Sequence, residues 1–433
     1  MKILFISQNA AGVDLAWRLQ QEGHQVKFFV ADKFLQDCYT GLIRQKIKDW
    51  KKELTWVKKD GLIVFDFSGA GKVQDQLRKA GYLVVGGSEI GDLLENNRNF
   101  GQRIFLQVGM EIAFSRTFSN IDTAIDFIKR HPSCWVIKQN GQLKKTLNYV
   151  GKREDGADVI AMLNFYKRTL PKKQINFDLQ EKVQGVEIGV GRYFNGQNWV
   201  GPIEFNIEHK SLFCGGLGPK TDEMGTVMWY DDDENNPIYQ ATIAKMENYL
   251  RRINFVGDFE INCIVNSEHI YPLEATTRFG CPALQLQTQI HLSPWGEFFL
   301  ALAQKKDYQL KWRRGEGLII LVAGPPFPYE INDKKQTSNG VEILLEDELL
   351  TKKRHCLHLE EVCYCQEENK LLVTGNSGYI LHVSNFQEDL QDARKEILQD
   401  LKKIYIPKMF YREDIGEKFL VSDRQKLEKW KLI

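Results

Sequence analysis

GDFEINCIVNSEHIYPLEATTRFG, residues 257–280, is the stretch of sequence that decides the fold. Its alternating apolar residues predict two strands, 258–265 and 270–275, joined by a short turn. Glu260 and Glu274 lie inside these strands, where an acidic residue lowers strand propensity. Because side chains alternate between faces, both carboxylates are expected on the same face of the hairpin. Two facing carboxylates repel each other unless a hard cation lies between them, so the pattern predicts a Mg²⁺ site.

A basic residue, Arg278, follows the second strand and is expected to stabilise negative charge that develops at this site. A solvated face of an ordinary hairpin is the alternative interpretation of two acidic residues in such a position. The Arg-Phe-Gly turn that follows Glu274 so closely favours a site for a metal ion and a nucleotide.

Composition limits the class of protein. The chain has 433 residues, of which 43% are hydrophobic, so we expect two to four structural units with sizeable cores. The net charge of +1 gives no reason to expect a nucleic-acid or membrane partner. The apolar run at the start of the sequence is shorter than that expected of a signal peptide, and no run approaches the roughly 20 apolar residues that span a membrane. A cytoplasmic location is therefore expected.

Eight cysteines are scattered along the chain without the spacing of a disulfide framework. Cys356, His358, Cys363 and Cys365 lie close in sequence, but their spacing fits no zinc motif. Buried thiols are the preferred interpretation of these residues.

The pattern of apolar runs and breaks predicts the order of the elements. Two β-α-β units, over residues 2–30 and 62–85, predict an open and mostly parallel sheet at the start of the chain. Further elements are expected as follows: a charged helical segment at 33–59, helices at 90–110, 237–252 and 386–403, and a β-hairpin at 177–194 with Gly185 in its turn.

The turn Ser68-Gly-Ala-Gly-Lys72 superficially resembles a phosphate-binding P-loop. Asp66 stands where the first glycine of that motif belongs, and Val73 follows the lysine, so the motif fails. We expect only a strand-to-helix turn beside a ligand crevice.

Several motifs resemble, in order along the chain, those of the phosphoribosylamine–glycine ligase family of ATP-grasp ligases. LEATTRFGCP at 273–282 is similar to the family's LEFNxRFGDPE. The other matches are QEKVQGVE at 180–187 with the hinge motif ExxLxGxE, EHK at 208–210 and GPKTDEMG at 218–225 with DHKR and GPNTGGMG, TGNSGYIL at 374–381 with TNGGRVLG, and FYREDIG at 410–416 with YRxDIG.

The resemblance implies an α/β (α+β) fold in three parts. These are a Rossmann-like pre-ATP-grasp domain with an open parallel sheet at 1–95, a two-lobed ATP-grasp domain at 96–308 with its hinge near 180–187, and a small β-rich C-terminal domain with a terminal helix at 309–433. The implied enzyme is an ATP-dependent ligase that forms a C–N bond through an acyl phosphate, from glycine and 5-phosphoribosylamine in the family.

The resemblance also implies roles for individual residues. Those for catalysis are Arg278 with Lys144 or Lys145; those for ATP are Arg98, Lys138, Gln180, Glu181, Val183 and Glu187; those for Mg²⁺ or Mn²⁺ are Glu260, Glu274 and Thr276; and those for substrate are Asn9, His209, Lys210, Gly218, Lys220 and Thr221. The expected partners are small molecules, with no nucleic acid and no membrane, and the expected state is a monomer or a homodimer.

Three segments depart from the family pattern. The N-terminal loop GxGGREHAL, which contacts the ribose phosphate in the family, reads SQNAAGVDL at 7–15, where Asn9, Asp14 and a helix N-terminus are the groups expected to bind a polar ligand. The glycine-rich phosphate loop reads GQLKKTLN at 141–148 and keeps one glycine. Near Arg278, Cys281 and Ala283 replace the Asp and Glu of RFGDPE. The open alternatives are therefore a different amine or small carboxylate, or a nucleotide-binding pseudoenzyme.

Overall fold

A four-stranded parallel sheet, in the order β2-β1-β3-β4, opens the computed structural model, which describes residues 1–139, 147–170 and 176–433. Its elements are β1 (Lys2–Ser7), α1 (Val13–Gln21), β2 (Gln25–Val30), β3 (Leu62–Phe65), α3 (Gly71–Lys79) and β4 (Leu83–Val85). These bounds confirm the two β-α-β units expected from the sequence. Because β1 and β3 are adjacent and parallel, the loops that follow them lie side by side at the carboxyl ends of the strands.

The helix expected at 33–59 is wrong. This segment holds only short turns of helix, at Lys33–Leu35, Trp50–Glu53 and α2 (Leu54–Val57). Tyr39 and Gly41 have positive φ angles of 58° and 79°, which a helix excludes. Contacts distant in sequence hold the segment in this path, because the backbone N–H of Tyr39 donates to the Val362 carbonyl at 2.7 Å.

Two other expected helices are interrupted. The segment 90–110 forms α4 (Glu89–Asn96) and α5 (Arg98–Gln107), because Asn97 is extended and caps α5 by accepting the Phe100 N–H. The segment 237–252 forms α8 (Pro237–Ala241) and α9 (Glu247–Arg252), separated at Thr242.

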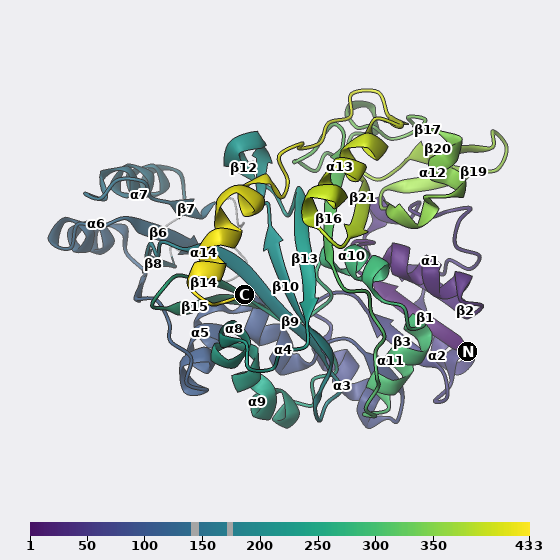
Figure 1. The fold of residues 1–433 in the computed structure, drawn as a ribbon, viewed down its shortest axis with the longest axis horizontal. Helices are drawn as coiled ribbons and strands as arrows, with labels where there is room; N and C mark the ends of the chain where they lie inside the picture. The colour runs from purple at the N-terminus through teal and green to yellow at the C-terminus, as the bar shows by residue number, and fades with distance from the viewer. Residues whose placement is uncertain (140–146, 171–175) are drawn as a thin grey trace.

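An eight-stranded antiparallel sheet forms the centre of the molecule (Figure 1), in the order β15-β14-β9-β10-β13-β16-β21-β18. The strands are β9 (Val186–Phe194), β10 (Trp199–Glu208), β13 (Gly225–Asp231), β14 (Gly257–Val265), β15 (Ile270–Thr276), β16 (Glu316–Ala323), β18 (Leu357–Leu359) and β21 (Tyr379–Gln387). The expected domain boundary at residue 309 divides this sheet. Its strands β16, β18 and β21 come after residue 309 and extend the part formed by β9 and β14. The three domain boundaries stay a prediction.

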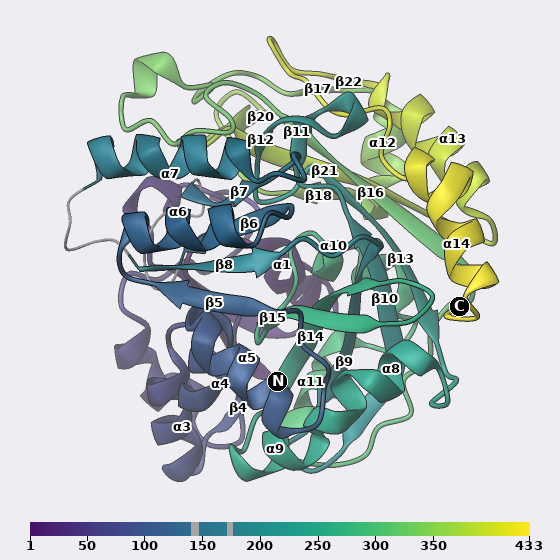
Figure 2. The same ribbon diagram turned by 90° about the vertical axis from the view of Figure 1, so that its left-hand side faces the viewer.

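A smaller lobe projects from this body at the left of Figure 1. Its four-stranded sheet has the order β5-β8-β6-β7 and consists of β5 (Ser115–Phe118), β6 (Trp135–Gln139), β7 (Tyr149–Val150) and β8 (Phe177–Glu181). Helices α6 (Ile121–Arg130) and α7 (Ala157–Thr169) lie together on one face of it (Figure 2). The lobe has a hydrophobic core of its own.

The hairpin expected at 177–194 is wrong, and the reason concerns the hinge. β8 pairs with β5 and β6 in the small lobe, whereas β9 pairs with β10 and β14 in the large sheet. The segment 182–185 therefore connects two sheets. Gly185 lies so close to the Val265 carbonyl that a Cβ there would be 2.3 Å from it, so the crossing is tight.

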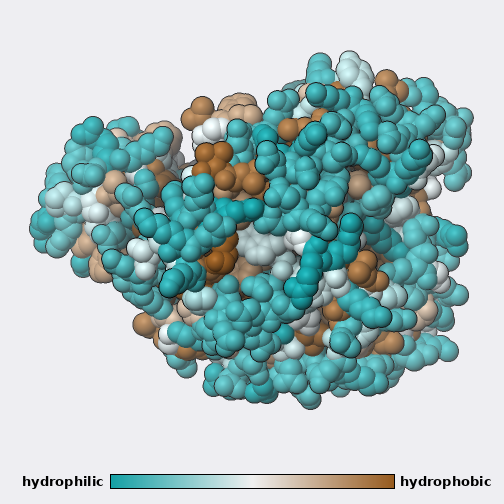
Figure 3. Space-filling model, viewed as in Figure 1, coloured by the Kyte–Doolittle hydropathy of each residue, from teal (hydrophilic) through white to brown (hydrophobic). Residues whose placement is uncertain are grey.

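The remaining helices and strands lie around these sheets. They are β11 (Ser211–Phe213), β12 (Leu217–Lys220), α10 (Ala283–Ile290), α11 (Trp295–Ala303), β17 (Leu344–Leu345), α12 (Asp347–Thr351), β19 (Val362–Cys365), β20 (Lys370–Val373), α13 (Leu390–Leu401), β22 (Ile404–Tyr405) and α14 (Arg424–Lys429). Helix α11 packs against β3 and β4 of the N-terminal sheet. The face in Figure 3 is mostly hydrophilic, with small separate groups of hydrophobic side chains. Within the described ranges, the helices are too short or too polar to cross a membrane.

Candidate active site

A cavity of about 380 Å³ lies where the N-terminal sheet, the large sheet and the C-terminal segments meet. Its walls come from the loops after β1 and β3, from β10, from the segment before β13, from the hairpin β14–β15, and from the segments at 327–330, 360–361 and 376–379. Among the residues that the structure describes, ten acidic side chains line the cavity and two basic ones do, Lys210 and Arg278. The cavity is thus strongly acidic.

The hairpin places its acidic residues as the alternation predicts. Glu260 pairs with Thr276 and Asn262 pairs with Glu274 across the two strands, and all four side chains line the cavity. Asn262 was missed in the sequence. Its position two residues after Glu260 places it on the same face, and this period-two signal would have found it.

Oxygen atoms around this hairpin fit a hard cation. The Asn206 Nδ2 donates to Glu260 Oε2 at 2.6 Å. The Oδ1 atoms of Asn206 and Asn262 are buried and have no hydrogen-bond partner among the described residues. Burial and the charges of Glu208 and Glu204 raise the pKa of Glu260 well above its usual value, which a cation would reverse.

Protein carboxylates alone do not complete a metal site here. Within the described residues, no group of three or more His, Cys, Asp or Glu side chains is arranged to hold a metal ion. Mg²⁺ usually binds through one or two carboxylates plus substrate phosphates and water. Glu260 and Glu274, with the amide oxygen of Asn262, fit that kind of shared site.

Lys210 links the hairpin β14–β15 to the end of β10. Its Nζ lies 2.6 Å from Glu208 Oε2 and 3.9 Å from Glu274 Oε1. Burial lowers the pKa of Lys210, but Glu208, Glu274 and Glu187 together raise it well above the usual value. Lys210 therefore stays protonated, and it lines the cavity.

Arg98 and Lys138, which are expected at the nucleotide, interact with residues of both the small lobe and the large sheet. The Arg98 guanidinium donates to the Gln180 side chain and to the Leu273 carbonyl, which joins helix α5 to β8 and β15. Burial lowers the pKa of Lys138, Arg98 lowers it further, and the carboxylates of Glu274 and Glu187 act against this.

These couplings gather Lys138, Glu187 and Glu274 from three strands of two sheets. Glu181 and Val183 belong to the end of β8 and the crossing after it. Lys144 and Lys145, expected in the phosphate loop, lie outside the described residues.

Arg278 is held by a residue of the N-terminal region. Its Nε donates to Glu95 Oε1 at 3.0 Å, and its Nη1 donates to the Phe279 carbonyl at 3.1 Å. The pairing with Glu95 leaves the guanidinium at the cavity wall in one fixed position. An arginine fixed in this way is suited to stabilise negative charge that forms beside it.

The residues expected at the substrate separate into two groups. Asn9, Lys210 and Thr221 line the cavity, whereas His209, Gly218 and Lys220 do not. His209 accepts the Gly416 N–H at 3.3 Å, and burial lowers its pKa to about 4.

Hydrogen bonds join the motif at 410–416 to the segment between the motifs at 208–210 and 218–225. Arg412, in the motif at 410–416, donates to the Ser211 carbonyl at 2.7 Å, and Asp414 accepts the Gly215 N–H at 2.8 Å.

The loop after β1 is organised around a carboxylate. Asp66 Oδ2 accepts the Ser7 hydroxyl at 2.6 Å and the Gly12 N–H at 2.8 Å, at the start of α1. Burial raises the pKa of Asp66 to about 6. Asp14, expected here as a ligand residue, is buried elsewhere: its carboxylate lies 2.8 Å from His358 Nδ1 and 2.7 Å from Arg18 Nε.

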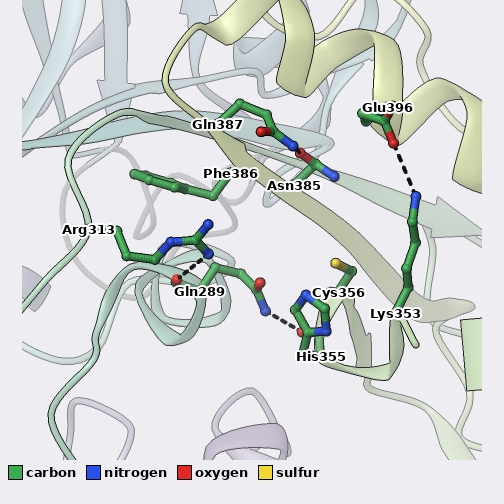
Figure 4. A pocket seen from close by; sticks show the side chains of 9 residues that line it. All are labelled: Gln289, Arg313, Lys353, His355, Cys356, Asn385, Phe386, Gln387 and Glu396. Carbon is green, nitrogen blue, oxygen red and sulfur yellow. Dashed lines mark hydrogen bonds and ion pairs between the residues drawn. The ribbon is translucent and has the colours of Figure 1, made fainter. Parts of the chain in front are cut away.

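A second and smaller cavity, of about 180 Å³, lies beneath α13 (Figure 4). Its charged side chains are already engaged. Lys353 contacts Glu396 at 3.1 Å and Asp400 at 2.8 Å, and the Arg313 guanidinium lies over the Phe386 ring. This pocket offers no free charge among the side chains that line it.

Comparison with known proteins finds relatives along the whole chain. The phosphoribosylamine–glycine ligase of Halalkalibacterium halodurans is 23% identical over 440 residues, which cover 98% of each chain. The crystal structure of the Thermotoga maritima phosphoribosylamine–glycine ligase superposes with a TM-score of 0.71 and 19% identity, over 96% of this chain and all of that one. The chain is thus similar to phosphoribosylamine–glycine ligases over nearly its whole length. No protein-family model matches it.

Enzymes other than phosphoribosylamine–glycine ligases share this fold. The biotin carboxylase domain of Hydrogenobacter thermophilus 2-oxoglutarate carboxylase, solved with MgADP and bicarbonate, superposes with a TM-score of 0.64 at 10% identity, over 99% of this chain and 97% of that one. The α/β (α+β) fold class expected from the sequence is confirmed. Compared with the motifs of the ligases that it resembles, this chain has the acidic residues of hairpin β14–β15 and lacks the Arg and His of the N-terminal loop.

Proposed function

We propose that the protein is an ATP-dependent carboxylate–amine ligase that works through an acyl phosphate. The observation that carries the proposal is the shared face of β14 and β15. There Glu260, Asn262 and Glu274 line a cavity together with two fixed cations, Lys210 and Arg278. The full-length similarity to phosphoribosylamine–glycine ligases supports the same reaction class.

The proposed binding mode follows from where the residues lie. The adenine and ribose bind between the lobes, near Gln180, Glu181, Val183 and Glu187, and the phosphates extend past Arg98 and Lys138 toward the hairpin. When bound, Mg²⁺ neutralises phosphate charge, and Glu260 and Glu274 would hold it. The biotin carboxylase with MgADP supports this arrangement as a relative of the same fold.

The chain's own residues then position the reactants. Lys210, kept protonated by Glu208 and Glu274, binds an anionic group of the substrate or phosphate. Arg278, fixed by Glu95, stabilises the oxyanion that forms when the amine attacks the acyl carbon. The C–N bond forms, the C–O bond to phosphate breaks, and the amine loses a proton.

The test needs no knowledge of the amine. Hydroxylamine attacks an acyl phosphate in place of the amine and yields a hydroxamate and phosphate. With ATP, Mg²⁺ and a panel of amino acids and small carboxylates, the purified chain should form hydroxamate and ADP in equal amounts. Tight ATP binding without hydroxamate from any carboxylate would identify a nucleotide-binding pseudoenzyme.

A further inference from the structure

Strand β9 lies between β10 and β14 in the large sheet, and it carries two glycines, Gly189 and Gly191, at alternate positions. The neighbouring strands carry polar side chains opposite these glycines. They are Asn206 and Asn262 opposite Gly189, and Glu204 and Glu260 opposite Gly191. Residues that pair directly across strands share a face of the sheet. The glycines therefore leave a gap on β9 with two polar side chains on each side of it.

The side chain of Asn206 reaches across β9 through this gap. Its Nδ2 donates to Glu260 Oε2 at 2.6 Å, although a whole strand separates β10 from β14. Neighbouring strands lie about 4.8 Å apart, so the backbones that carry these two side chains are about 10 Å apart. A Cβ at Gly189 would overlap Asn206 Oδ1 and lie 2.8 Å from Asn206 Cγ. The hydrogen bond between Asn206 and Glu260 thus depends on a glycine at position 189.

Further hydrogen bonds hold Asn206 in this position. The same Nδ2 donates to Glu204 Oε1 at 3.1 Å, and Glu204 Oε2 accepts Gln287 Nε2 of α10 at 2.6 Å. Gln287 in turn accepts the Tyr193 hydroxyl at 2.5 Å. The exposed fractions of Asn206, Glu204 and Gln287 are 1%, 4% and 1%. Burial and this chain of hydrogen bonds therefore fix the Asn206 amide before any ligand binds.

Glu260 is the residue at which this chain of hydrogen bonds meets the cavity. Its side chain lines the cavity, and among the described residues its only hydrogen bond is the one that Oε2 accepts from Asn206. The other oxygen, Oε1, is therefore left for a ligand. Hydrogen bonds of this kind, made behind a carboxylate that binds a metal ion, set the direction in which the carboxylate points.

We propose that Asn206 is a positioning residue for Glu260 at the metal site. Its amide, which reaches through the gap at Gly189, holds Oε2 of Glu260 and so directs Oε1 toward the cation. This role rests on the proposed function, because the cation is the Mg²⁺ of the proposed ligase. If Asn206 served only to stabilise the fold, its loss would lower stability without changing which cation the site prefers.

Binding of AMPPNP, a non-hydrolysable ATP analogue, tests this role without turnover. Isothermal titration measures its Kd with Mg²⁺, which requires a near-ideal octahedron of ligands, and with Ca²⁺, which accepts a flexible geometry. Asn206→Leu removes the donor at similar volume. We expect the Kd of this variant to rise at least tenfold with Mg²⁺ and less than threefold with Ca²⁺. Equal rises with both cations, or no rise with Mg²⁺, would overturn the role.

The glycine at 189 gives a second test, in which Asn206 itself is kept. Gly189→Ala places a methyl group where the Asn206 amide lies, so it should also raise the Kd more with Mg²⁺ than with Ca²⁺. Gly317→Ala is the matched control, because its methyl group would lie 2.8 Å from Leu286 in the same sheet but outside the cavity. Thermal unfolding midpoints check that each variant is folded. A folded Gly189→Ala with the wild-type ratio of the two Kd values contradicts the role.

A double-mutant cycle tests whether Asn206 acts through Glu260. Glu260→Gln removes the charge that Asn206 directs toward the cation. In that background Asn206→Leu should raise the Kd with Mg²⁺ less than twofold, because the two residues act as one unit. A further tenfold rise would show that Asn206 acts independently of Glu260 and would overturn the role.

The positioning role and the ligase fail in different ways. AMPPNP binding needs neither the carboxylate nor the amine, so variants with the wild-type ratio of Kd values overturn the role of Asn206 and leave the ligase intact. Absence of hydroxamate with every carboxylate overturns the ligase. AMPPNP binding that is equally tight in the wild type with Mg²⁺ and with EDTA overturns the metal site, and the role of Asn206 with it.

Discussion

Asp66 Oδ2 accepts the backbone N–H of Gly12 at 2.8 Å, so a carboxylate of the protein occupies the amino end of helix α1. In the family that this chain resembles, the corresponding loop contacts a ribose phosphate. Here the loop has no cation, and its helix terminus is already engaged. The backbone N–H of Gly12, which could otherwise donate to an anionic ligand, thus donates to the carboxylate of Asp66.

The first prediction follows from this replacement: 5-phosphoribosylamine should be a poor acceptor. A phosphate dianion needs cationic or clustered N–H partners, and a helix dipole at an exposed end offers only about 0.3–1 kcal/mol. The opposing charge comes from Asp66, and not from Asp14, which is paired with Arg18 and His358. An ADP-release assay with glycine and freshly generated phosphoribosylamine, set against non-phosphorylated amines, measures this. Efficient formation of glycinamide ribonucleotide would refute it.

The second prediction concerns the metal hairpin. Glu274→Gln removes a charge at nearly constant volume, so turnover should fall roughly 100-fold or more while the fold is kept. Nucleotide binding should also require Mg²⁺ or Mn²⁺. Glu268→Gln, whose exposed side chain lies in the turn of the same hairpin, is the matched control. Near-normal turnover in Glu274→Gln would show that this hairpin has been assigned wrongly.

The third prediction concerns the nucleotide. Lys138→Met and Glu187→Ala each remove a charge-assisted hydrogen bond, so each should weaken ATP binding by roughly 1.5–3 kcal/mol. Isothermal titration measures this directly. Lys129→Met, on the exposed face of α6 in the same lobe, should bind ATP normally. If both Lys138→Met and Glu187→Ala bound ATP with unchanged affinity, the nucleotide would not bind between the two lobes as proposed.

The hairpin and the first sheet were predictable because their signals are local. Period-two alternation fixes the shared face of Glu260 and Glu274 from neighbouring residues alone. The β-α-β units likewise follow from short apolar runs and their breaks. The irregular path of 33–59 was not predictable, because it depends on a contact between Tyr39 and Val362, far apart in the sequence.

The meeting of Asp66 and Glu360 at one cavity was hidden for the same reason. Glu360 lies nearly 300 residues from Asp66, and no spacing in the sequence links them. The pairing of Arg278 with Glu95 and the split of β8 and β9 between two sheets also depend on tertiary packing. The motif at 180–187 predicted a hinge near these residues. It did not predict that β8 and β9, on either side, belong to different sheets.

The fourth prediction concerns pH and stability. Glu204 and Asp258 are buried together and share one donor, since Gln287 Nε2 lies 2.6 Å from Glu204 Oε2 and 3.4 Å from Asp258 Oδ2. Burial, and then the charge of Asp258, raise the pKa of Glu204 to about 8. A pKa that is higher in the folded than in the unfolded state gives stability that is present at low pH and lost as pH rises through about 8.

Glu204→Gln cannot lose this proton. The unfolding temperature of Glu204→Gln, relative to that of the wild type, should therefore increase as pH rises from 5.5 to 9. In the control, Glu388→Gln, the difference from the wild type should stay constant. Circular dichroism melts at both pH values measure the difference. A constant difference between Glu204→Gln and wild type would contradict the prediction.

The most direct test of the ligase is the transfer of oxygen during catalysis. If an acyl phosphate forms, a carboxylate labelled with ¹⁸O must pass one labelled oxygen to inorganic phosphate when hydroxylamine completes the reaction. We predict one ¹⁸O in each phosphate released, measured by mass spectrometry, and loss of this signal in Glu274→Gln. Phosphate that carries no label from any carboxylate, released at the same rate without hydroxylamine, would show that the protein hydrolyses ATP without activating a carboxylate.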